Sequence, residues 1–454
     1  MTVLAYIVGV LVLAVGVAAS IALHEVGHLV PAKRFGVRVT QYMVGFGPTI
    51  WSRRRGETEY GVKAIPLGGY IRMIGMFPPR PGEDPTKVRV SSTGRFSQLA
   101  DEARKASLEE LRPGDEDRVF YRLPVHRKVI IMLGGPLMNF VIGTVLLTVL
   151  VTAHGMLAVQ EGARVAAVAE CVKTFEAAQT DPSCAGAPET PANAAGILPG
   201  DEIRTINGEP VLSSADVGRL VRPRVDQPTD VVVLRAGTER TLSVTPILNT
   251  LPAYDDQGQP ILGADGKQKV VETGYLGVSS AALLDYETQP ITAVPGIIGE
   301  NLWRTATAIV RIPQKMVGVW NAAFSGQERD LESPISVVGV GRVAGDVSAG
   351  KLDDVVGESW GDKAWFLVML IASLNFMLFV FNLIPLLPLD GGHVAGALWE
   401  GTKKGWARMR GNPDPGHVDV AKALPVAYAV SLGLLVMSAL LIYADIVNPI
   451  DLGG

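Results

Sequence analysis

The chain has 454 residues, of which 48% are hydrophobic and only 6% aromatic, and its formal net charge is −4. Its mean hydropathy is positive, and Ala, Val, Leu and Ile carry most of the apolar content. This composition argues against a soluble globular protein and favours a protein that resides in a membrane.

Four long segments contain no charged side chain: residues 2–23, 129–153, 364–389 and 423–444. Each meets the length of roughly 20 residues that a helix needs to cross a bilayer. The first segment lacks the basic stretch that begins a signal peptide, so we expect it to be a retained helix. The predicted fold is a polytopic α-helical membrane protein with four transmembrane helices.

The first apolar segment ends in the sequence HEVGH. His24 and His28 are about one helical turn apart and can hold one zinc ion through their imidazoles. Glu25 adjoins them and could polarise a metal-bound water and take its proton. Ionisable side chains at the edge of a membrane span are costly and usually functional. We therefore interpret the motif as a catalytic zinc site rather than a chance match or a pair of structural histidines.

Short apolar and β-branched runs separated by Gly and Pro fill residues 34–77. They predict a β-hairpin or small sheet on the cytoplasmic face, which could dip into the membrane where its backbone lines a cavity. Its segment Pro66 to Met73, with Gly68 and Gly69, could form an edge that receives an unwound substrate strand. Residues 78–118, rich in Pro, Ser, Thr and charge, predict a flexible insertion.

A β-rich domain is predicted after the second span. Residues 194–211 read AAGILPGDEIRTINGEPV, in which Asn207-Gly208 favours a hairpin turn, and two alternating strands follow. Residues 160–248 resemble a PDZ domain, a module that captures an extended peptide at a sheet edge. A β-rich domain that only shields or sizes what approaches is the alternative.

Two further features lie between the second and third spans. Cys171 and Cys184 could form a disulfide in an oxidising compartment, with two free thiols as the alternative. Residues 296–321 mix apolar and basic side chains. They predict either an interfacial helix, broken at Pro313, or an ordinary amphipathic packing helix.

The third span supplies a candidate third zinc ligand, because catalytic sites commonly have three protein ligands and a water. Residues 374–394 read LNFMLFVFNLIPLLPLDGGHV and contain Asp390 and His393. We favour Asp390 because it ends the span, whereas His393 follows two glycines and could simply cap or pack.

Basic residues at the span ends predict the orientation. The group comprises Lys33, Arg34, Arg38, Arg127, Lys128, Lys403, Lys404 and Arg408. All belong on the cytoplasmic side, so the N-terminus, the loop 154–363 and the C-terminus are expected outside. The HEVGH turn and Asp390 then lie on the same side, near the cytoplasmic face.

Together these features resemble the site-2 intramembrane metalloproteases, peptidase family M50, specifically the bacterial RseP-like branch with a single PDZ domain. The resemblance runs along nearly the whole chain. It is carried by HEVGH, GGPLMNF (134–140), the PDZ-like pattern, SPISVVGVGRVAG (333–345) and NLIPLLPLDGGH (382–393). HExxH followed by NxxPxxPLDG in a later span is the most specific combination.

The resemblance implies zinc ligands and a catalytic base, namely His24, His28 and Asp390 with Glu25. It also implies that Asn382 helps to hold substrate. Asn375 resembles an upstream family asparagine, although its spacing to Asn382 is two residues wider than in the RseP pattern. Asn139 matches the family's GPxxN motif, and we expect it to form an interhelical hydrogen bond.

The expected units follow in chain order: 1–33, transmembrane helix 1 with HExxH; 34–77, a membrane-associated β-hairpin region; 78–127, a cytoplasmic insertion; 128–153, transmembrane helix 2; 160–248, the PDZ domain; 249–363, an extracytoplasmic linker with amphipathic helices; 364–390, transmembrane helix 3 with the LDG motif; 391–422, a cytoplasmic loop; and 423–445, transmembrane helix 4.

The predicted function is cleavage of transmembrane segments of single-pass proteins by a Zn²⁺ enzyme in the bacterial plasma membrane. A helical peptide bond has its carbonyl already hydrogen-bonded, so the substrate must unwind before water can attack. The resemblance implies pre-trimmed anti-sigma factors or remnant signal peptides as substrates, with a peptide or ectodomain at the PDZ domain. We expect no nucleic-acid partner. The alternative is a membrane-tethered metalloprotease that acts on cytoplasmic proteins. A zinc transporter is less favoured because the second and fourth spans lack His, Asp and Glu.

Overall fold

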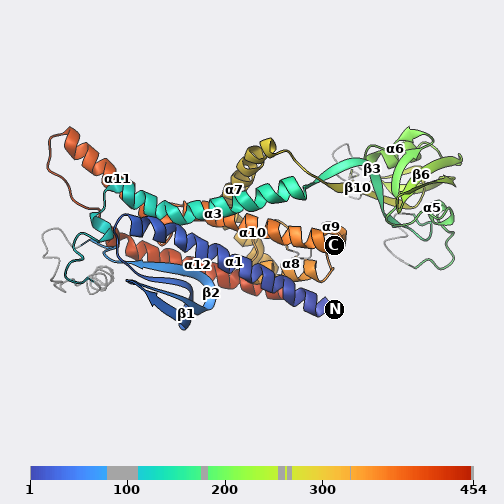
Figure 1. Ribbon diagram of the computed structural model, residues 1–454. Helices are drawn as coiled ribbons and strands as arrows, with labels where there is room; N and C mark the ends of the chain where they lie inside the picture. The colour runs from blue at the N-terminus through green and yellow to red at the C-terminus, as the bar shows by residue number, and fades with distance from the viewer. Residues whose placement is uncertain are drawn as a thin grey trace. The chain divides into compact units, whose positions relative to one another are not determined.

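The computed structural model describes residues 2–78, 111–174, 183–253, 261–262, 268–327 and 329–450. Two compact units share the chain, one made of Met1–Ala153 with Gln289–Gly454 and the other of His154–Thr288. Figure 1 labels their helices and strands. The first unit is helical apart from one sheet, and the second consists mostly of strands.

Within the described ranges, four helices are long and apolar enough to cross a membrane, as the sequence predicts. They are α1 (Thr2–Arg34), α3 (Val125–Ala153), α10 (Trp360–Asn382) and the segment Val420–Val447, which contains α12 (Leu424–Val447). Large apolar side chains on them, such as Leu4, Val15 and Leu432, are exposed. Such surfaces suit contact with lipid tails, so the prediction of a membrane protein with four spanning helices is confirmed.

α1 ends at a glycine just before the sheet begins. Gly36 has a φ of +86°, its amide donates to the carbonyl of Lys33, and the amide of Val37 donates to that of Ala32. These two bonds form a Schellman motif, in which glycine tolerates the left-handed conformation that other residues resist. The chain leaves the helix there and enters the first strand at Val39.

Glycines let α1 and α3 touch through their backbones. A Cβ added at Gly27 would lie 2.2 Å from the carbonyl oxygen of Gly134, and one at Gly134 would lie 2.0 Å from the oxygen of Gly27. A Cβ at Gly135 would lie 2.1 Å from Nε2 of His28. Small residues permit such close approach between membrane helices. The crossing therefore brings the histidine-bearing part of α1 directly against α3.

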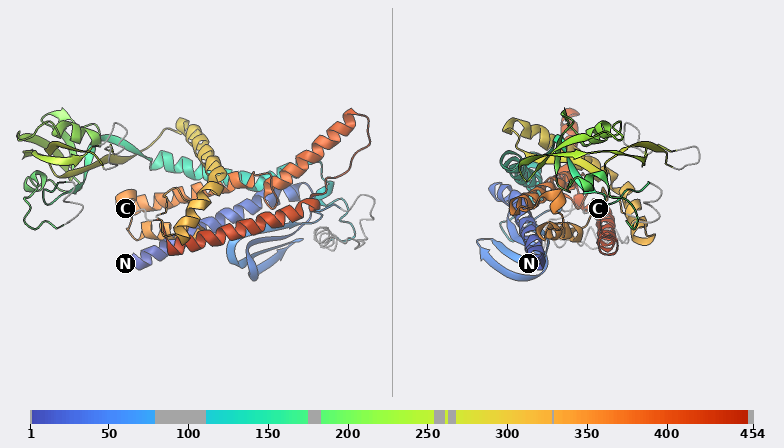
Figure 2. Two further views of the ribbon diagram at one scale, coloured as in Figure 1. Left: turned by 180° about the vertical axis from the view of Figure 1, so that it is seen from behind. Right: turned by 90° about the vertical axis from the view of Figure 1, so that its right-hand side faces the viewer.

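β1 (Val39–Arg55) and β2 (Thr58–Met73) form an antiparallel sheet on the outer side of the helices, beside α1 (Figures 1 and 2). Both strands bend back on themselves, since Gln41 lies opposite residues in both halves of β2. The hydroxyl of Tyr42 donates to the carbonyl of Ala22 at 2.8 Å. The sheet is thus attached to the helix that carries HEVGH.

Residues 111–123 pack against the sheet and α1, which corrects the flexible insertion predicted for 78–118. Arg38 and Asp115 form an ion pair whose side chains are 8% and 7% exposed. The apolar run that ends the segment is buried in the same core. This local packing outweighs a composition that looked typical of a linker. The rest of the predicted insertion, 79–110, lies outside the described residues.

The third predicted span is not one helix as far as residue 390. α10 ends at Asn382, and α11 (Asp390–Met409) begins at Asp390. Pro385 and Pro388 lie between them, and each lacks the backbone donor that a continuous helix would use. Asp390 therefore starts a new helix instead of ending the span.

α7 (Val294–Phe324) crosses the long helices (Figure 2) and passes through Pro313 without ending. The break at Pro313, which belonged to one of the two alternatives, is therefore wrong; Val319 and Ala323 beyond the proline pack against Leu441 of α12 and hold the helix in place. The shorter helices α8 (Val337–Ser348) and α9 (Asp353–Val356) precede α10.

The second unit contains a sheet with the strand order β10-β3-β4-β6-β7, to which β5 adds by pairing with β4, and a separate β8-β9 hairpin. The elements are β3 (Met156–Val168), α5 (Pro191–Ala194), β4 (Glu202–Ile206), β5 (Glu209–Pro210), α6 (Ser214–Val221), β6 (Thr229–Arg235), β7 (Thr238–Val244), β8 (Ile247–Pro252), β9 (Val270–Tyr275) and β10 (Val278–Glu287). The unit extends beyond the predicted 160–248 because β10, at its far end, pairs with β3 at its start.

Two side-chain links join residues that are distant in the sequence of this unit. Cys171 and Cys184 are joined by a disulfide. Asp201, in the PGDEI motif, is 1% exposed and accepts two hydrogen bonds of 2.6 Å from Arg235 on β6. Its carboxylate also accepts from the amide of Leu198 at 2.9 Å. The motif therefore fixes the turn that leads into β4.

Candidate metal centre

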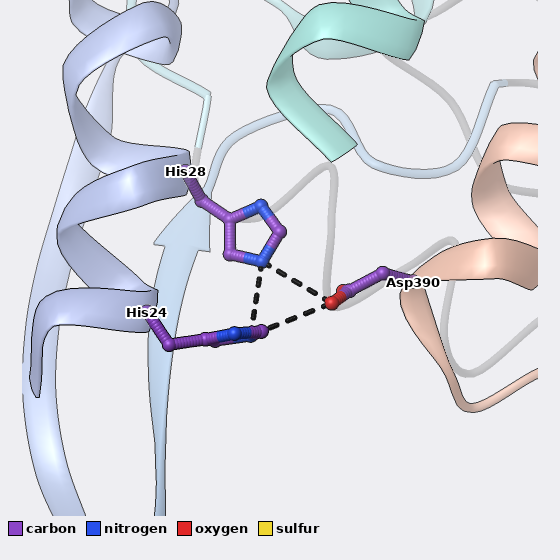
Figure 3. A group of neighbouring side chains, drawn as sticks. All are labelled: His24, His28 and Asp390. Carbon is purple, nitrogen blue, oxygen red and sulfur yellow. Dashed lines mark hydrogen bonds and ion pairs between the residues drawn. The ribbon is translucent and has the colours of Figure 1, made fainter. Parts of the chain in front are cut away.

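Three side chains from two helices converge at one point (Figure 3). His24 and His28 lie on α1, and Asp390 is the first residue of α11. The two Nε2 atoms are 3.3 Å apart, and Oδ2 of Asp390 lies 3.4 Å from Nε2 of His24 and 3.3 Å from Nε2 of His28. Among the described residues this is the group of His, Cys, Asp or Glu whose ligand atoms could hold a metal ion together.

The spacing of these three atoms fits zinc. Zinc–ligand bonds of about 2.0–2.1 Å at tetrahedral angles place neighbouring ligand atoms about 3.3–3.4 Å apart. The three measured separations, 3.3, 3.3 and 3.4 Å, agree with that value. Two imidazoles and one carboxylate also match the mixed nitrogen and oxygen donor set of catalytic zinc sites, which keep a fourth position open.

The backbone of α3 orients His28. Its Nδ1 lies 2.7 Å from the carbonyl oxygen of Ile131, and its side chain is 6% exposed. A carbonyl can only accept, so Nδ1 carries the hydrogen and Nε2 keeps its lone pair for a metal. The close approach of Gly135 leaves the ring no room on that side.

Asn139, also on α3, contacts the other histidine. Its amide group lies 3.1 Å from Nδ1 of His24, and the residue is 1% exposed. The expected interhelical hydrogen bond of Asn139 is therefore present, and its partner is a candidate metal ligand.

Glu25 follows His24 on α1 and is 7% exposed. A Cβ added at Gly69 would lie 2.9 Å from Cγ of Glu25, so the glycine allows strand β2 to pass against this side chain. The backbone of Ile71 also lies near the Glu25 carboxylate. The 69–71 part of β2 thus lies next to the residue predicted to act as the base.

The other predicted substrate-binding residues lie in different settings. Asn375 is 1% exposed and donates from its amide nitrogen to Ser20 at 2.9 Å and to Ile371 at 2.8 Å, so it ties α10 to α1. Asn382 is half-buried at the end of α10. Gly68 has a φ of +138° and packs against the ring of Phe46.

His393, the rival ligand, lies outside the cluster. It lines a small cavity with Lys128 and Glu400 instead. Sequence reasoning also missed Glu400, whose side chain is 3% exposed and pairs with Lys128 at 2.8 Å. An isolated Glu within a basic stretch was the available signal. The contribution of the Ile131 carbonyl has no sequence signal, because any residue carries one.

Four membrane-length helices, a His–His–Asp cluster and a buried glutamate beside it define a membrane-embedded metallopeptidase. The profile described as "Peptidase family M50" matches residues 12–411. The chain belongs to peptidase family M50.

Three curated relatives align with 82–98% of the chain. It is 32% identical to "Zinc metalloprotease Rip1" of Mycobacterium tuberculosis over 98% of this chain and 99% of that protein. It is 28% identical to "Metalloprotease MmpA" of Caulobacter vibrioides over 85% and 84% of the two chains. It is 24% identical to "Zinc metalloprotease RasP" of Geobacillus kaustophilus over 82% and 84%.

Proposed function

We propose that this protein is a zinc metalloendopeptidase that cleaves transmembrane segments of single-span membrane proteins. The observation that carries the proposal is the tetrahedral spacing of the ligand atoms of His24, His28 and Asp390. Glu25 is next in sequence to His24, and both lie on α1, a helix long enough to span a membrane. The family membership and the zinc metalloproteases among the relatives support it.

His24, His28 and Asp390 would hold the metal. Zinc bound there supplies a Lewis acid that polarises a carbonyl and lowers the pKa of water. Glu25 accepts the proton from the attacking water and returns it to the leaving amine. Its burial keeps bulk solvent from competing for that proton, and the close passage of β2 at Gly69 confines the side chain.

The substrate strand is proposed to align along β2 near Gly69 and Ile71. A helical peptide bond must unwind before attack, and an extended segment gains main-chain hydrogen bonds by adding to a strand. The contact between this part of β2 and Glu25 supports the placement, since an aligned strand would pass close to the base. Asn382, at the end of the helix before Asp390, is proposed to help hold that strand.

The second unit is proposed to be an extracytoplasmic PDZ domain that binds a peptide or limits access by bulky ectodomains. β10 is an edge strand of its sheet, and Ser280 on β10 donates to the carbonyl of Ser214 at the start of α6 at 3.0 Å. The basic span ends support an active site near the cytoplasmic face of a bacterial plasma membrane. Pre-trimmed anti-sigma factors and remnant signal peptides are the proposed substrate classes.

The test compares two substrates in lipid nanodiscs that contain the zinc-loaded full chain. One is a single transmembrane helix and the other is a water-soluble peptide of ordinary sequence. We expect cleavage of the helix, and we expect Glu25→Gln to lower the rate by about 10²–10⁴-fold while zinc content is unchanged. Full activity of the variant would refute the assignment of the base. Cleavage of the soluble peptide as fast as the helix would instead support a membrane-tethered protease for cytoplasmic proteins.

A further inference from the structure

We propose that Asn139 is a positioning residue that accepts a hydrogen bond from Nδ1 of His24 and thereby frees Nε2 of that histidine for zinc. The inference rests on the proposed zinc site and assigns Asn139 a task beyond joining two helices. The two histidines have different partners on α3, the Ile131 carbonyl for His28 and the Asn139 side chain for His24.

The His28 side is already determined. The Ile131 carbonyl at 2.7 Å cannot donate, so the hydrogen of a neutral His28 ring is on Nδ1. Nε2 is then bare and points at Oδ2 of Asp390, 3.3 Å away. A ligand histidine usually donates its other ring N–H to an oxygen acceptor in this way, which fixes both tautomer and ring orientation.

On the His24 side, the partner of Nδ1 can either donate or accept. In the orientation that the structure has, the amide nitrogen of Asn139 faces Nδ1 at 3.1 Å. Nδ1 would then be an acceptor, and the ring hydrogen would lie on Nε2, among the three converging ligand atoms. A hydrogen there blocks metal binding. Meanwhile Oδ1 of Asn139 is buried without a hydrogen-bond partner in the described part of the chain.

A half-turn of the amide resolves the conflict. Asparagine oxygen and nitrogen exchange positions in such a turn without moving the rest of the side chain. Oδ1 then faces Nδ1 of His24 and accepts its hydrogen, and Nε2 gains the lone pair that a metal needs. α3 would thus supply an acceptor for each histidine, a backbone carbonyl from Ile131 and a side-chain oxygen from Asn139.

The chain offers a matched control. Asn375 is as buried as Asn139, at 1% exposure, and also bridges two membrane-length helices, but its partners are Ser20 and a backbone carbonyl rather than a histidine. A merely structural role predicts the same behaviour for both asparagines. A positioning role predicts a change in metal affinity at Asn139 alone.

The first measurement is made on the wild-type chain and uses a variant only to assign the signals. ¹⁵N spectra of the metal-free full chain, labelled at histidine and assigned with His24→Gln, report which ring nitrogen of His24 carries the hydrogen. We expect it on Nδ1. A hydrogen on Nε2 in the neutral ring would overturn the proposal, whatever the protease activity.

The second measurement is zinc affinity by competition with a chromogenic chelator, without substrate. Asn139→Leu should weaken binding about 10–100-fold, the range for lost outer partners of ligand histidines. Asn139→Asp, which keeps an acceptor oxygen, should stay within a few-fold of wild type, as should Asn375→Leu. Equal affinity for Asn139→Leu and wild type would refute the inference. So would an equal loss in Asn139→Asp and Asn139→Leu, provided both variants melt as cooperatively as wild type.

Discussion

Removal of the Glu400 charge leaves a lysine buried in the helical unit without its counter-ion. Nζ of Lys128 on α3 lies 2.8 Å from Oε2 of Glu400 on α11, and the side chains are 5% and 3% exposed. Lys404 and His417 also bind Glu400, at 2.8 and 3.2 Å, but they are 27% and 31% exposed. Burial raises the pKa of Glu400, yet the hydrogen bonds from these three groups outweigh it and hold the pKa well below its usual range. Glu400 is therefore a fixed negative charge.

The magnitudes separate the buried pair from the exposed one. Breaking a buried ion pair by removing one partner costs about 3–5 kcal/mol, whereas an exposed i,i+4 pair contributes about 0.3–0.5 kcal/mol. We therefore expect Glu400→Leu to lower the free energy of unfolding by about 3–5 kcal/mol and Lys404→Met by less than about 1 kcal/mol. The double variant Lys128→Met with Glu400→Leu should recover most of the loss, because apolar replacement of a whole buried pair is often neutral.

The assay is SDS-titration unfolding of the full chain in mixed micelles, followed by tryptophan fluorescence, with zinc affinity measured on the same samples. Because α11 begins at Asp390, we expect zinc affinity to fall in Glu400→Leu and to return in the double variant. A stability loss in Glu400→Leu no larger than that in Lys404→Met would refute the reasoning. Failure of the double variant to recover would show that Glu400 acts through its other partners.

Two further predictions concern separate units. The Cβ added by Gly135→Ala would lie only 2.1 Å from the present position of Nε2 of His28, so the imidazole ring must move. Zinc affinity should then fall at least about 10-fold, as it does when a ligand histidine loses its outer hydrogen-bond partner. The control variant Gly433→Ala, whose new Cβ meets no atom within 4 Å, should bind zinc normally. Burial raises the pKa of Asp201, but the hydrogen bonds from Arg235 outweigh burial, and the net pKa is lowered. The Asp201 carboxylate therefore stabilises the folded state fully above its unfolded pKa, near 4. This stabilisation is lost as the pH falls through the lower pKa of the folded state. Protection of the β4 and β6 amides against hydrogen exchange, relative to the intrinsic exchange rate at each pH, should therefore fall below about pH 4 in the full chain, and Asp201→Asn should flatten that acid response.

The four spans and the ligand residues could be predicted because each depends on local sequence. Uncharged runs of sufficient length have few fates other than a membrane, and HEVGH fixes its own spacing on any helix. Asp390 could be proposed because a third ligand was required and the family motif contains an aspartate. The spans were confirmed, and the structure brings Asp390 to the two histidines.

The remaining features depend on contacts between distant segments. Nothing near Glu400 in the sequence indicates that Lys128 is its partner, and the three prolines Pro313, Pro385 and Pro388 do not all have the same effect on their helices. Pro313 lies in a helix whose later turns are held by α12, so the helix continues. Pro385 and Pro388 are only three residues apart and each removes a helical backbone donor, and the helix ends before them. Composition alone cannot distinguish these cases.

The origin of the ligands in two helices has a consequence for biosynthesis. His24 and His28 leave the ribosome early with the first span, while Asp390 follows only after the second unit and the third span have been made. At about 5–20 residues per second, the two events are roughly 20–70 s apart. A nascent chain therefore carries an incomplete ligand set while its neighbours in the membrane are being inserted. Such a chain cannot cleave them, and no separate inhibitory segment is needed to protect them during translation.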